Sequence, residues 1–341
     1  MGKIRYQDNS LITYDEWLLL RNNSLGASEV GIVCFGSQYT SNIELFYQKV
    51  GAPKQSIENL RMYLGKVTED ISEHLWAHYD GTEQSVVDNI RKGTPVKKSI
   101  NTRVTAFNDD YPHLSVTIDR EIQPFGRYEG MGKGALEIKN TQSFVLNSYE
   151  SGLPTANVVQ LCTQIMVNEF LYGELFYFVD NRTCQCHPVK REEMKPLEEL
   201  ILERTIPFWD NVLKARPIYN QLYEARRSFN QRLVAECERE IASLEPPAQY
   251  TSGYNSFLSQ KYKDRLSFSG IVEGTEDMYA TAKKHKETAK AIAALEQSML
   301  ECEISLKNII GSKSSISFGN RGEVSWNPNK HGKRVFLNKI K

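Results

Sequence analysis

The chain has 341 residues, of which 40% are hydrophobic and 25% are charged, which is ordinary for one large soluble domain or a domain with an extension. Its 42 basic and 42 acidic residues cancel, so a site for a polyanion has to come from local clustering rather than overall charge. The first ten residues lack the apolar core of a signal peptide, and no run of about 18 apolar residues predicts a membrane span. Six scattered cysteines predict no disulfide framework. We therefore expect a protein of the reducing cytoplasm.

The N-terminal part of the chain is predicted to be helical. Thr13, with Glu16 three residues later, has the spacing of a capping box at the start of a helix. Ser28 is a candidate cap for the next, shorter helix. Residues 41–50 predict a third helix, and residues 58–79 predict a longer amphipathic helix.

The pattern then changes to that of strands. Residues 84–107 alternate loosely and contain β-branched residues such as Val86. The run 113–122 is strand-like, and residues 134–140 form the next strand after a glycine-rich turn over 126–134. The two runs therefore predict a hairpin.

A helix that begins with a proline is predicted over 154–171, and a buried strand over 174–180. Residues 192–217 have a helical pattern that we expect to be broken near its two prolines. The alternation of helices and strands up to residue 217 indicates a mixed α/β core.

Residues 218–341 are predicted to form a C-terminal extension. It contains a charged helix, a long helix over 276–310 and a basic, β-like tail over 312–341. The long helix is a candidate for intramolecular packing or for a coiled-coil arm. The tail has aromatic residues between its lysines and arginines, so DNA contact, a solvated appendage and partner docking all remain open for it.

A glutamate and a lysine stand two residues apart in the apolar run GALEIKN, residues 134–140. A strand points residues i and i+2 to the same face, so Glu137 and Lys139 are expected to project together. Asp119 ends the preceding apolar run, before the glycine-rich turn. An aspartate, a turn and a strand that carries Glu-x-Lys form the pattern of PD-(D/E)xK nucleases. A cross-strand ion pair is the alternative explanation of the same residues.

These residue types suit the hydrolysis of a phosphodiester. A hard divalent cation such as Mg²⁺ prefers oxygen ligands, and two carboxylates on neighbouring strands can hold it while a substrate phosphate completes its shell. The cation lowers the pKa of a bound water molecule and offsets the charge that builds on the phosphate. A lysine beside the cation can orient or deprotonate that water, because the nearby positive charge is expected to lower the lysine pKa.

Other polar residues accompany this pattern in a fixed order along the chain. Each one alone is also explained as a solvated helix face or as ordinary polar surface. An arginine suits bidentate phosphate binding, and a helix N-terminus adds N–H donors. The residues are Arg21 and Ser28 around a Gly-Ala turn, Glu69 in the helix predicted over 58–79, and Gln160 with Gln164 on the helix after the Glu-x-Lys strand.

Together these segments resemble the YqaJ-type viral recombinase family of alkaline exonucleases, which includes phage lambda exonuclease and belongs to the PD-(D/E)xK nuclease superfamily. The resemblance runs through residues 13–215 and is carried by RNNSLGASEVGIV, YLGKVTEDI, SVTIDREI, ALEIKN, VVQLCTQIMV and IPFWDNVLKARP. It implies an α/β fold with a restriction-endonuclease-like core, in which helices flank a mixed β-sheet, over residues 1–217. The helical and small β extension over 218–341 matches less closely.

The resemblance also implies roles at the metal site. Asp119 and Glu137 would be metal ligands together with the backbone carbonyl of Ile138, and Lys139 would be the catalytic lysine. Glu69 would support the metal or its waters from the helix.

The resemblance implies two further groups of residues. Gln160 would position the metal-bound water or the lysine, with Gln164 as the other candidate. Arg21, Ser28 and Thr117 would bind the 5′-phosphate of a DNA end, and the threonine keeps the hydroxyl of the serine expected in relatives.

The function implied is a Mg²⁺-dependent 5′→3′ exonuclease on double-stranded DNA, in which Mn²⁺ can substitute. It would release 5′-mononucleotides and leave 3′ single-stranded overhangs for phage or mobile-element recombination in a bacterial host cytoplasm. A single-strand annealing protein as partner and a ring-shaped homotrimer follow from the same resemblance. A structure- or sequence-specific endonuclease on the same core, and a non-catalytic DNA-binding assembly protein, are the alternatives.

The run Cys184-Gln185-Cys186-His187 has some features of a metal site. It lacks a second Cys or His pair at a useful spacing, and strand alternation places both cysteines on one face. We therefore expect a structural role for this run.

Overall fold

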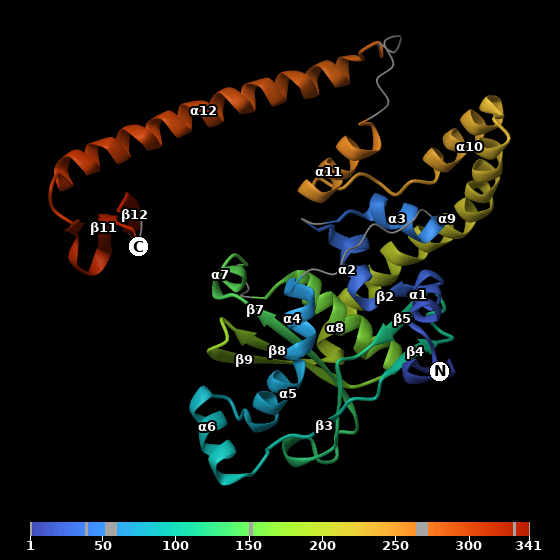
Figure 1. Ribbon diagram of the computed structural model, residues 1–341, viewed down its shortest axis with the longest axis horizontal. Coiled ribbons are helices and arrows are strands. Elements are labelled where there is room, and N and C mark those ends of the chain that lie inside the picture. The colour runs from blue at the N-terminus through green and yellow to red at the C-terminus, as the bar shows by residue number, and fades with distance from the viewer. Residues whose placement is uncertain are drawn as a thin grey trace. The chain divides into compact units, whose positions relative to one another are not determined.

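The computed structural model describes residues 2–37, 40–51, 60–149, 153–263, 272–329 and 332–340 (Figure 1). The chain forms two compact units, Met1–Arg265 and Leu266–Lys341. In the described part of the chain, no helix combines the length and the apolar character needed to cross a membrane.

In the described residues of the first unit, nine strands form two sheets. They are β1 (Ile4–Asp8), β2 (Leu25–Gly26), β3 (Ser99–Ile100), β4 (Val104–Asn108), β5 (Leu114–Thr117), β6 (Arg120–Ile122), β7 (Gly134–Thr141), β8 (Tyr172–Val179) and β9 (Thr183–Lys190). One sheet has the order β1-β4-β5-β2, and the other has the order β3-β6-β7-β8-β9. The pairs β2–β5 and β7–β8 are parallel and the others are antiparallel, so both sheets are mixed. This mixed α/β architecture agrees with the sequence prediction.

The helices of the first unit surround these sheets. They are α1 (Tyr14–Asn22), α2 (Ala27–Phe35), α3 (Asn42–Val50), α4 (Leu60–Val67), α5 (Glu69–His78), α6 (Glu83–Lys92), α7 (Ser143–Leu146), α8 (Thr155–Asn168), α9 (Lys195–Arg227), α10 (Gln231–Ser243) and α11 (Ser252–Lys261).

Strands β7 and β8, which lie side by side in Figure 1, are mostly buried because helices cover both of their faces. Ala135 and Leu175 pack with Leu161 of α8, whereas Leu136 packs with Trp76 of α5. Successive side chains of a strand point to opposite faces, so odd-numbered residues of β7 face α8 and even-numbered residues face α5. Burial of a side chain of this size contributes about 1.5–3 kcal/mol, which fixes the register of the sheet between the two helices.

A second and larger core joins the N-terminal helices to the first sheet. Val30 of α2, Phe46 of α3, Val159 of α8 and Trp209 of α9 belong to one buried cluster with Val116 of β5. This packing holds the N-terminus of α2 beside the end of β5.

One prediction about helix ends is confirmed, and another is wrong. Thr13 caps α1, and Glu16 completes the capping box. The cap of α2 is Gly26 rather than Ser28, because the Glu29 carboxylate accepts the Gly26 N–H at 2.8 Å. Ser28 lies in the first turn of α2 and is exposed.

The strand prediction over 84–107 is wrong in its first part, where α6 forms instead. Thr82 caps this helix and Gly93 ends it with a left-handed backbone. Val86 is the one buried residue of α6. The helix packs against α5, and this packing outweighs the preference of valine for strands. The helix predicted over 58–79 is two helices that meet at Thr68, and its first two residues lie outside the described part of the chain.

Helix α9 continues through Pro207 and Pro217, which corrects the break predicted there. Each proline removes one backbone hydrogen bond and normally destabilises a helix interior by about 3 kcal/mol. Phe208 and Trp209 follow the first proline and are buried in the larger core, so tertiary packing holds the helix together. Residue 217 therefore lies inside a continuous helix, and the domain boundary placed there stays a prediction.

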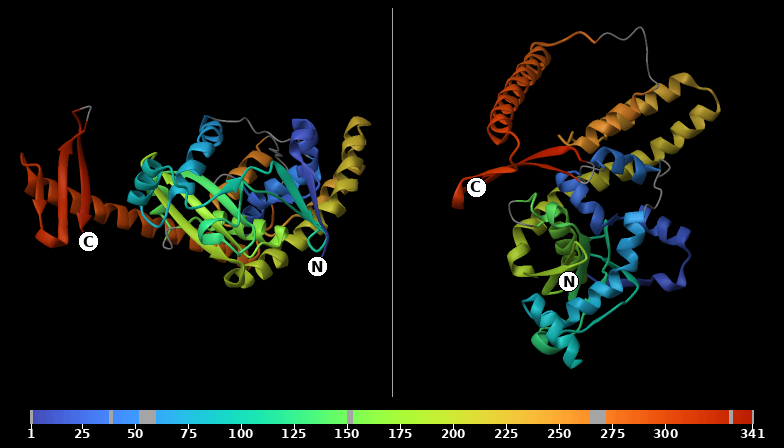
Figure 2. Two further views of the ribbon diagram at one scale, coloured as in Figure 1. Left: turned by 90° about the horizontal axis from the view of Figure 1, so that it is seen from below. Right: turned by 60° about the vertical axis from the view of Figure 1, so that its left-hand side comes forward.

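The second unit consists of one long helix and a small sheet. Helix α12 (Glu276–Ile310) leads into β10 (Ser315–Ser317), β11 (Gly322–Pro328) and β12 (Arg334–Ile340). The three strands pair in that order, all antiparallel, and both views of Figure 2 show them at the end of the helix. Trp326 stacks with Arg334, whose guanidinium carbon lies 3.9 Å from the ring centroid. The predicted long helix and β-like tail are both confirmed.

Candidate active site

Glu137 and Lys139 project from β7 toward α8, as strand alternation predicts. The Glu137 side chain is 1% exposed and forms an ion pair with Lys139, whose side chain is 31% exposed. Two glutamines of α8 donate to the same carboxylate. Gln160 Nε2 donates to Oε1 and Gln164 Nε2 donates to Oε2, each at 2.6 Å. A buried carboxylate is therefore held by three donors, of which only the lysine is charged.

Asp119 lies in the short link between β5 and β6 and contacts the same part of β7. Its Oδ2 accepts the Ile138 N–H at 2.8 Å. Burial and the neighbouring Glu137 carboxylate raise the pKa of Asp119 to about 8, although Lys139 acts in the opposite direction. The structure thus brings Asp119 to Glu137 and Lys139, which follow it after the glycine-rich turn, and crowds two carboxyl groups where a cation would favour their ionised forms.

The donor atoms at this point suit a divalent cation. Strand β6 pairs with β7 only as far as Leu136, so the next part of β7 has a free edge on that side. Because the N–H and C=O of one strand residue point to the same side, the Ile138 carbonyl is directed toward the edge where its N–H meets Asp119. Two carboxylates and one carbonyl are hard oxygen ligands of the kind Mg²⁺ prefers.

The ligand set is small. No group of three or more His, Cys, Asp or Glu side chains suited to a metal occurs in the part of the chain that the structure describes. A cation here would therefore depend on water and substrate oxygens for the remaining positions, which is usual for Mg²⁺.

The protonation of Lys139 follows from its neighbours. Burial lowers the pKa of Lys139, but the Glu137 and Asp119 carboxylates outweigh burial and raise it above the ordinary value. Without a cation, the lysine is therefore a proton-bearing partner of the two carboxylates. The lowering of its pKa expected from the sequence would need the charge of a bound metal.

The sequence predicted Glu69 inside the helix over 58–79, whereas in the structure it is the first residue of α5. Its carboxylate is bound by the Arg120 guanidinium. One cavity of about 430 Å³ is lined by Glu69, Thr117 and Asp119. Glu69 therefore lies beside the site, with its carboxylate paired to Arg120.

Arg120 is a site residue that the sequence reasoning missed. Its side chain is 3% exposed, and besides Glu69 it contacts Asp70 at 2.5 Å and Glu73 at 3.3 Å. It also donates to the carbonyl of Asp119 at 2.7 Å. Arg120 therefore fastens the first turn of α5 to the backbone of Asp119. The signal available was the position itself, a charged residue inside an apolar strand pattern, since such a residue is almost always paired.

The three residues expected at a 5′-phosphate are only partly brought together. The parallel pairing of Leu25 with Leu114 and of Gly26 with Ser115 sets the register of β2 and β5. Ser28 and Thr117 each follow two residues after the second pair, so both exposed side chains lie at the same end of neighbouring strands.

Arg21 occupies a different setting at the end of α1. Its guanidinium lies 3.6 Å from Glu29 and 4.9 Å from the centroid of the Trp17 ring. The buried Lys49 ammonium contacts the other Glu29 oxygen at 2.7 Å. Arg21 lines a cavity of about 610 Å³ with Glu29 and Lys49. Asp15 also lies in its wall, so the lining carries two basic and two acidic side chains.

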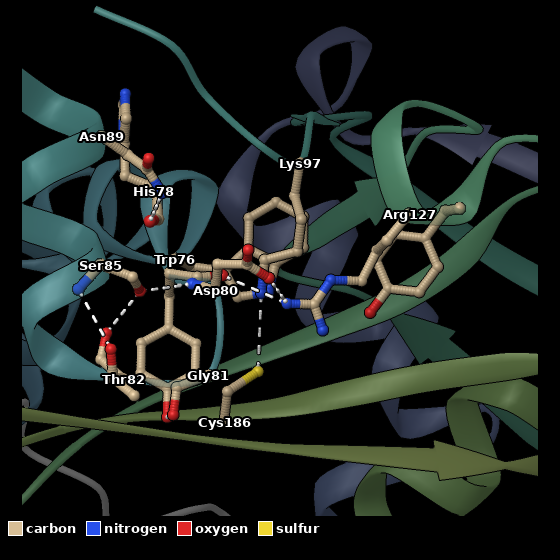
Figure 3. A network of polar contacts seen from close by, with 12 residues as sticks. Trp76, His78, Asp80, Gly81, Thr82, Ser85, Asn89, Lys97, Arg127 and Cys186 are labelled. Atoms are coloured by element: carbon tan, nitrogen blue, oxygen red, sulfur yellow. Dashed lines mark hydrogen bonds and ion pairs between the residues drawn. The ribbon is translucent and has the colours of Figure 1, made fainter. Parts of the chain in front are cut away.

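The opposite face of the sheet carries a second buried charge cluster. Lys97 and Glu174 are both 0% exposed and lie 3.1 Å apart. Trp76 and Tyr128 donate to the same Glu174 carboxylate. Figure 3 shows Lys97 directed at Cys186, with its Nζ 3.7 Å from the sulfur. The Cys-x-Cys run therefore lies in this structural cluster, away from Glu137.

Comparisons with known proteins find relatives for this part of the chain. Residues 16–170 match the family model of the YqaJ-like viral recombinase domain, and every residue proposed above for the site lies within that range. "Uncharacterized protein YqaJ" of Bacillus subtilis (strain 168) is 23% identical over 239 residues, which cover 69% of this chain and 67% of that protein.

Two solved structures are also similar. The structure of LHK-Exo in complex with dAMP is 16% identical with a TM-score of 0.43, and the match covers 64% of this chain and 99% of that chain. The alkaline exonuclease LHK-Exo from Laribacter hongkongensis is 16% identical with a TM-score of 0.41, over 65% of this chain and 98% of that chain.

Proposed function

We propose that this chain, whose residues 16–170 are a YqaJ-like viral recombinase domain, is a Mg²⁺-dependent exonuclease that digests duplex DNA from its 5′ ends during recombination. The observation that carries the proposal is the convergence of Asp119, Glu137 and Lys139, joined by the Ile138 N–H. In a purely structural arrangement each carboxylate would have its own cationic partner. Here two carboxylates lie beside one partly exposed lysine.

Asp119, Glu137 and the Ile138 carbonyl would hold the cation. When bound, it would activate water and neutralise charge on the scissile phosphate. Lys139 holds a proton at Nζ next to both carboxylates, so it can donate a hydrogen bond to the phosphate as negative charge develops. Gln160 reaches the same carboxylate from α8 and is suited to orient the lysine or a water molecule beside it.

The preference for a 5′ end is assigned to the neighbouring pocket. Ser28 lies in the first turn of α2, where free backbone N–H groups favour an anion. Thr117 adds a second hydroxyl at the same strand ends, and Arg21 adds a guanidinium of the kind that binds phosphate in a bidentate manner. A terminal phosphate held there would place the first phosphodiester near Asp119, because only Ile118 separates Thr117 from Asp119.

The remaining features of the proposal come from the family resemblance. They are the release of 5′-mononucleotides, a 3′ overhang that a single-strand annealing protein would bind, and a ring-shaped trimer around the DNA. Mn²⁺ is expected to replace Mg²⁺, since both accept oxygen ligands.

The test is digestion of linear duplex DNA by the full-length protein, with 5′-phosphate or 5′-hydroxyl ends and with Mg²⁺ or EDTA. We expect 5′-mononucleotides from the linear duplex in Mg²⁺, no products in EDTA, and a loss of about 10²- to 10⁴-fold in rate in Lys139→Ala. Lys133→Ala is the matched control, because Lys133 is an exposed lysine just before β7 that pairs with Glu121 at 2.9 Å rather than with Glu137.

A covalently closed circle added to the same reaction separates the alternatives. An exonuclease leaves the circle intact, whereas cutting of the circle would support an endonuclease on the same core. Folded wild-type protein that binds duplex DNA but cuts neither substrate would support the non-catalytic assembly protein and contradict the proposal.

A further inference from the structure

Gln164 is a fully buried neutral residue of the site whose amide nitrogen donates to two acceptors. Its side chain is fully buried, and its Nε2 donates both to the Thr117 carbonyl at 3.1 Å and to Glu137 Oε2 at 2.6 Å. Both partners can only accept, so the orientation of the amide is fixed. Its Oε1 is buried and has no hydrogen-bond partner among the described residues. The fold therefore tolerates an unsatisfied carbonyl in order to direct both N–H groups at these acceptors.

The two acceptors belong to the two segments that carry the carboxylates. Thr117 ends β5, two residues before Asp119, and Glu137 lies on β7, in the other sheet. The Ile138 N–H joins the same segments in the reverse direction, through the Asp119 carboxylate. Each segment is thus tied through its backbone to the carboxylate of the other, and Gln164 supplies one of these two links.

Gln160 contacts the same carboxylate in a different way. It lies one turn earlier on α8, is half-buried, and donates to Glu137 Oε1. That oxygen also receives the Lys139 ammonium. Oε1 is therefore shared by two donors on the more exposed side of the carboxylate, whereas Oε2 is held from the interior by Gln164.

We infer that Gln164 is the positioning residue that holds Glu137 for a divalent cation, and that Gln160 competes with the cation for Oε1. The inference rests on the proposed metal-dependent function. It separates the two glutamines by role: loss of Gln164 releases Glu137 from its position relative to Asp119, while loss of Gln160 frees an oxygen that the cation would use.

The experiment is calorimetric titration of Mn²⁺ alone into the full-length protein and its variants. Gln164→Met is expected to weaken Mn²⁺ affinity by about 10- to 100-fold, the usual effect of removing a residue that orients a metal ligand. Gln160→Met is expected to keep the affinity within about threefold of wild type or to increase it. Thr163→Val is the matched control, because its buried hydroxyl donates only to the Val159 carbonyl of the same helix, at 2.8 Å, and its affinity should not change.

Gln164→Glu is a second variant of equal size that replaces the two donors by acceptors, and it decides the matter if Gln164→Met does not fold. Unchanged Mn²⁺ affinity in the folded Gln164 variants, or equal losses in the Gln160 and Gln164 variants, would overturn the inference. If the wild type digests DNA while Gln164 proves irrelevant to Mn²⁺ binding, this inference alone fails. A wild type that neither binds Mn²⁺ nor digests DNA overturns both proposals.

Discussion

The five-stranded sheet carries a buried glutamate paired with a lysine on each of its faces. The two pairs differ in the exposure of the lysine and in the groups that surround the carboxylate. On the face toward α5, Lys97 and Glu174 are completely enclosed, and Trp76 and Tyr128 donate to the same carboxylate. On the face toward α8, Lys139 is partly exposed and a second carboxylate, Asp119, lies beside the pair.

The pKa shifts express this difference. Burial raises the pKa of Glu174, but Lys97 and the Tyr128 and Trp76 donors outweigh it, so the pKa lies below its usual value. At the other pair, burial and a like charge raise the pKa of Asp119. One cluster is electrostatically complete, whereas the other lacks a positive charge. A buried Glu–Lys pair therefore indicates a catalytic role only when the lysine is partly exposed to solvent and a second carboxyl group lies beside the pair.

The largest expected effect is on catalysis at the incomplete cluster. Asp119→Asn removes one of two carboxylate ligands while keeping the shape of the side chain, so DNA digestion should fall by at least about 10²-fold. Stability should stay equal or rise, because burial and Glu137 disfavour the charged form of Asp119. Digestion rates and urea unfolding of the same preparations check both parts. A loss of stability equal to that of a core substitution would mean that Asp119 has a structural role.

The second prediction concerns the complete cluster. Lys97→Met leaves the Glu174 charge buried without its cation, which typically destabilises a protein by about 3–5 kcal/mol. Urea unfolding followed by tryptophan fluorescence measures the change, with Arg5→Ala as a surface control, because Arg5 and its partner Asp109 are both exposed. A Lys97→Met protein as stable as that control would show that the pair does not support the fold.

A smaller effect is expected from pH. Because the pKa of Glu174 is lowered in the folded protein, its ionised form adds stability above the ordinary value of 4.5, and this stability is lost as pH falls through the folded pKa. The free energy of unfolding should therefore differ most between wild type and Glu174→Gln near neutral pH, and the difference should shrink in acid. A difference that grows as pH falls would contradict the assignment.

The smallest effect is expected at the neighbouring pocket. Arg21→Ala should reduce the preference for a 5′-phosphate over a 5′-hydroxyl end by about tenfold, the value of one charged hydrogen bond. Glu29 already neutralises part of the Arg21 charge, which limits the effect. Arg5→Ala is the control, since Arg5 pairs with Asp109 on the surface at 3.1 Å. Equal losses on both kinds of end would remove Arg21 from the pocket.

Residues whose roles depend on local pattern could be predicted from the sequence. The capping box of Thr13 and the shared face of Glu137 and Lys139 follow from spacing alone. The predicted hairpin forms only in part: the strand predicted over 113–122 is divided into β5 and β6, which belong to different sheets, and only β6 pairs with β7. The proximity of Asp119 to Glu137 followed from that hairpin together with the resemblance.

Contacts between distant segments could not be predicted in this way. Gln164 acts through Thr117, 47 residues earlier, and Arg120 acts through a helix 50 residues earlier. The sequence predictions at the prolines of α9 and at Val86 of α6 are wrong, because burial outweighs local preference at those places. Charged partners such as Lys97 and Glu174 have no sequence signal beyond their apolar surroundings.

The central claim is that only one of the two Glu–Lys pairs does chemistry. It is tested most directly by the rate of Mg²⁺-dependent digestion of linear duplex DNA, per folded molecule, for Lys139→Ala and Lys97→Met side by side. We expect Lys139→Ala to lose about 10²- to 10⁴-fold in rate while Lys97→Met, although less stable, digests at a rate near that of wild type. A Lys139→Ala protein as active as wild type, or a greater loss in Lys97→Met, would contradict the account.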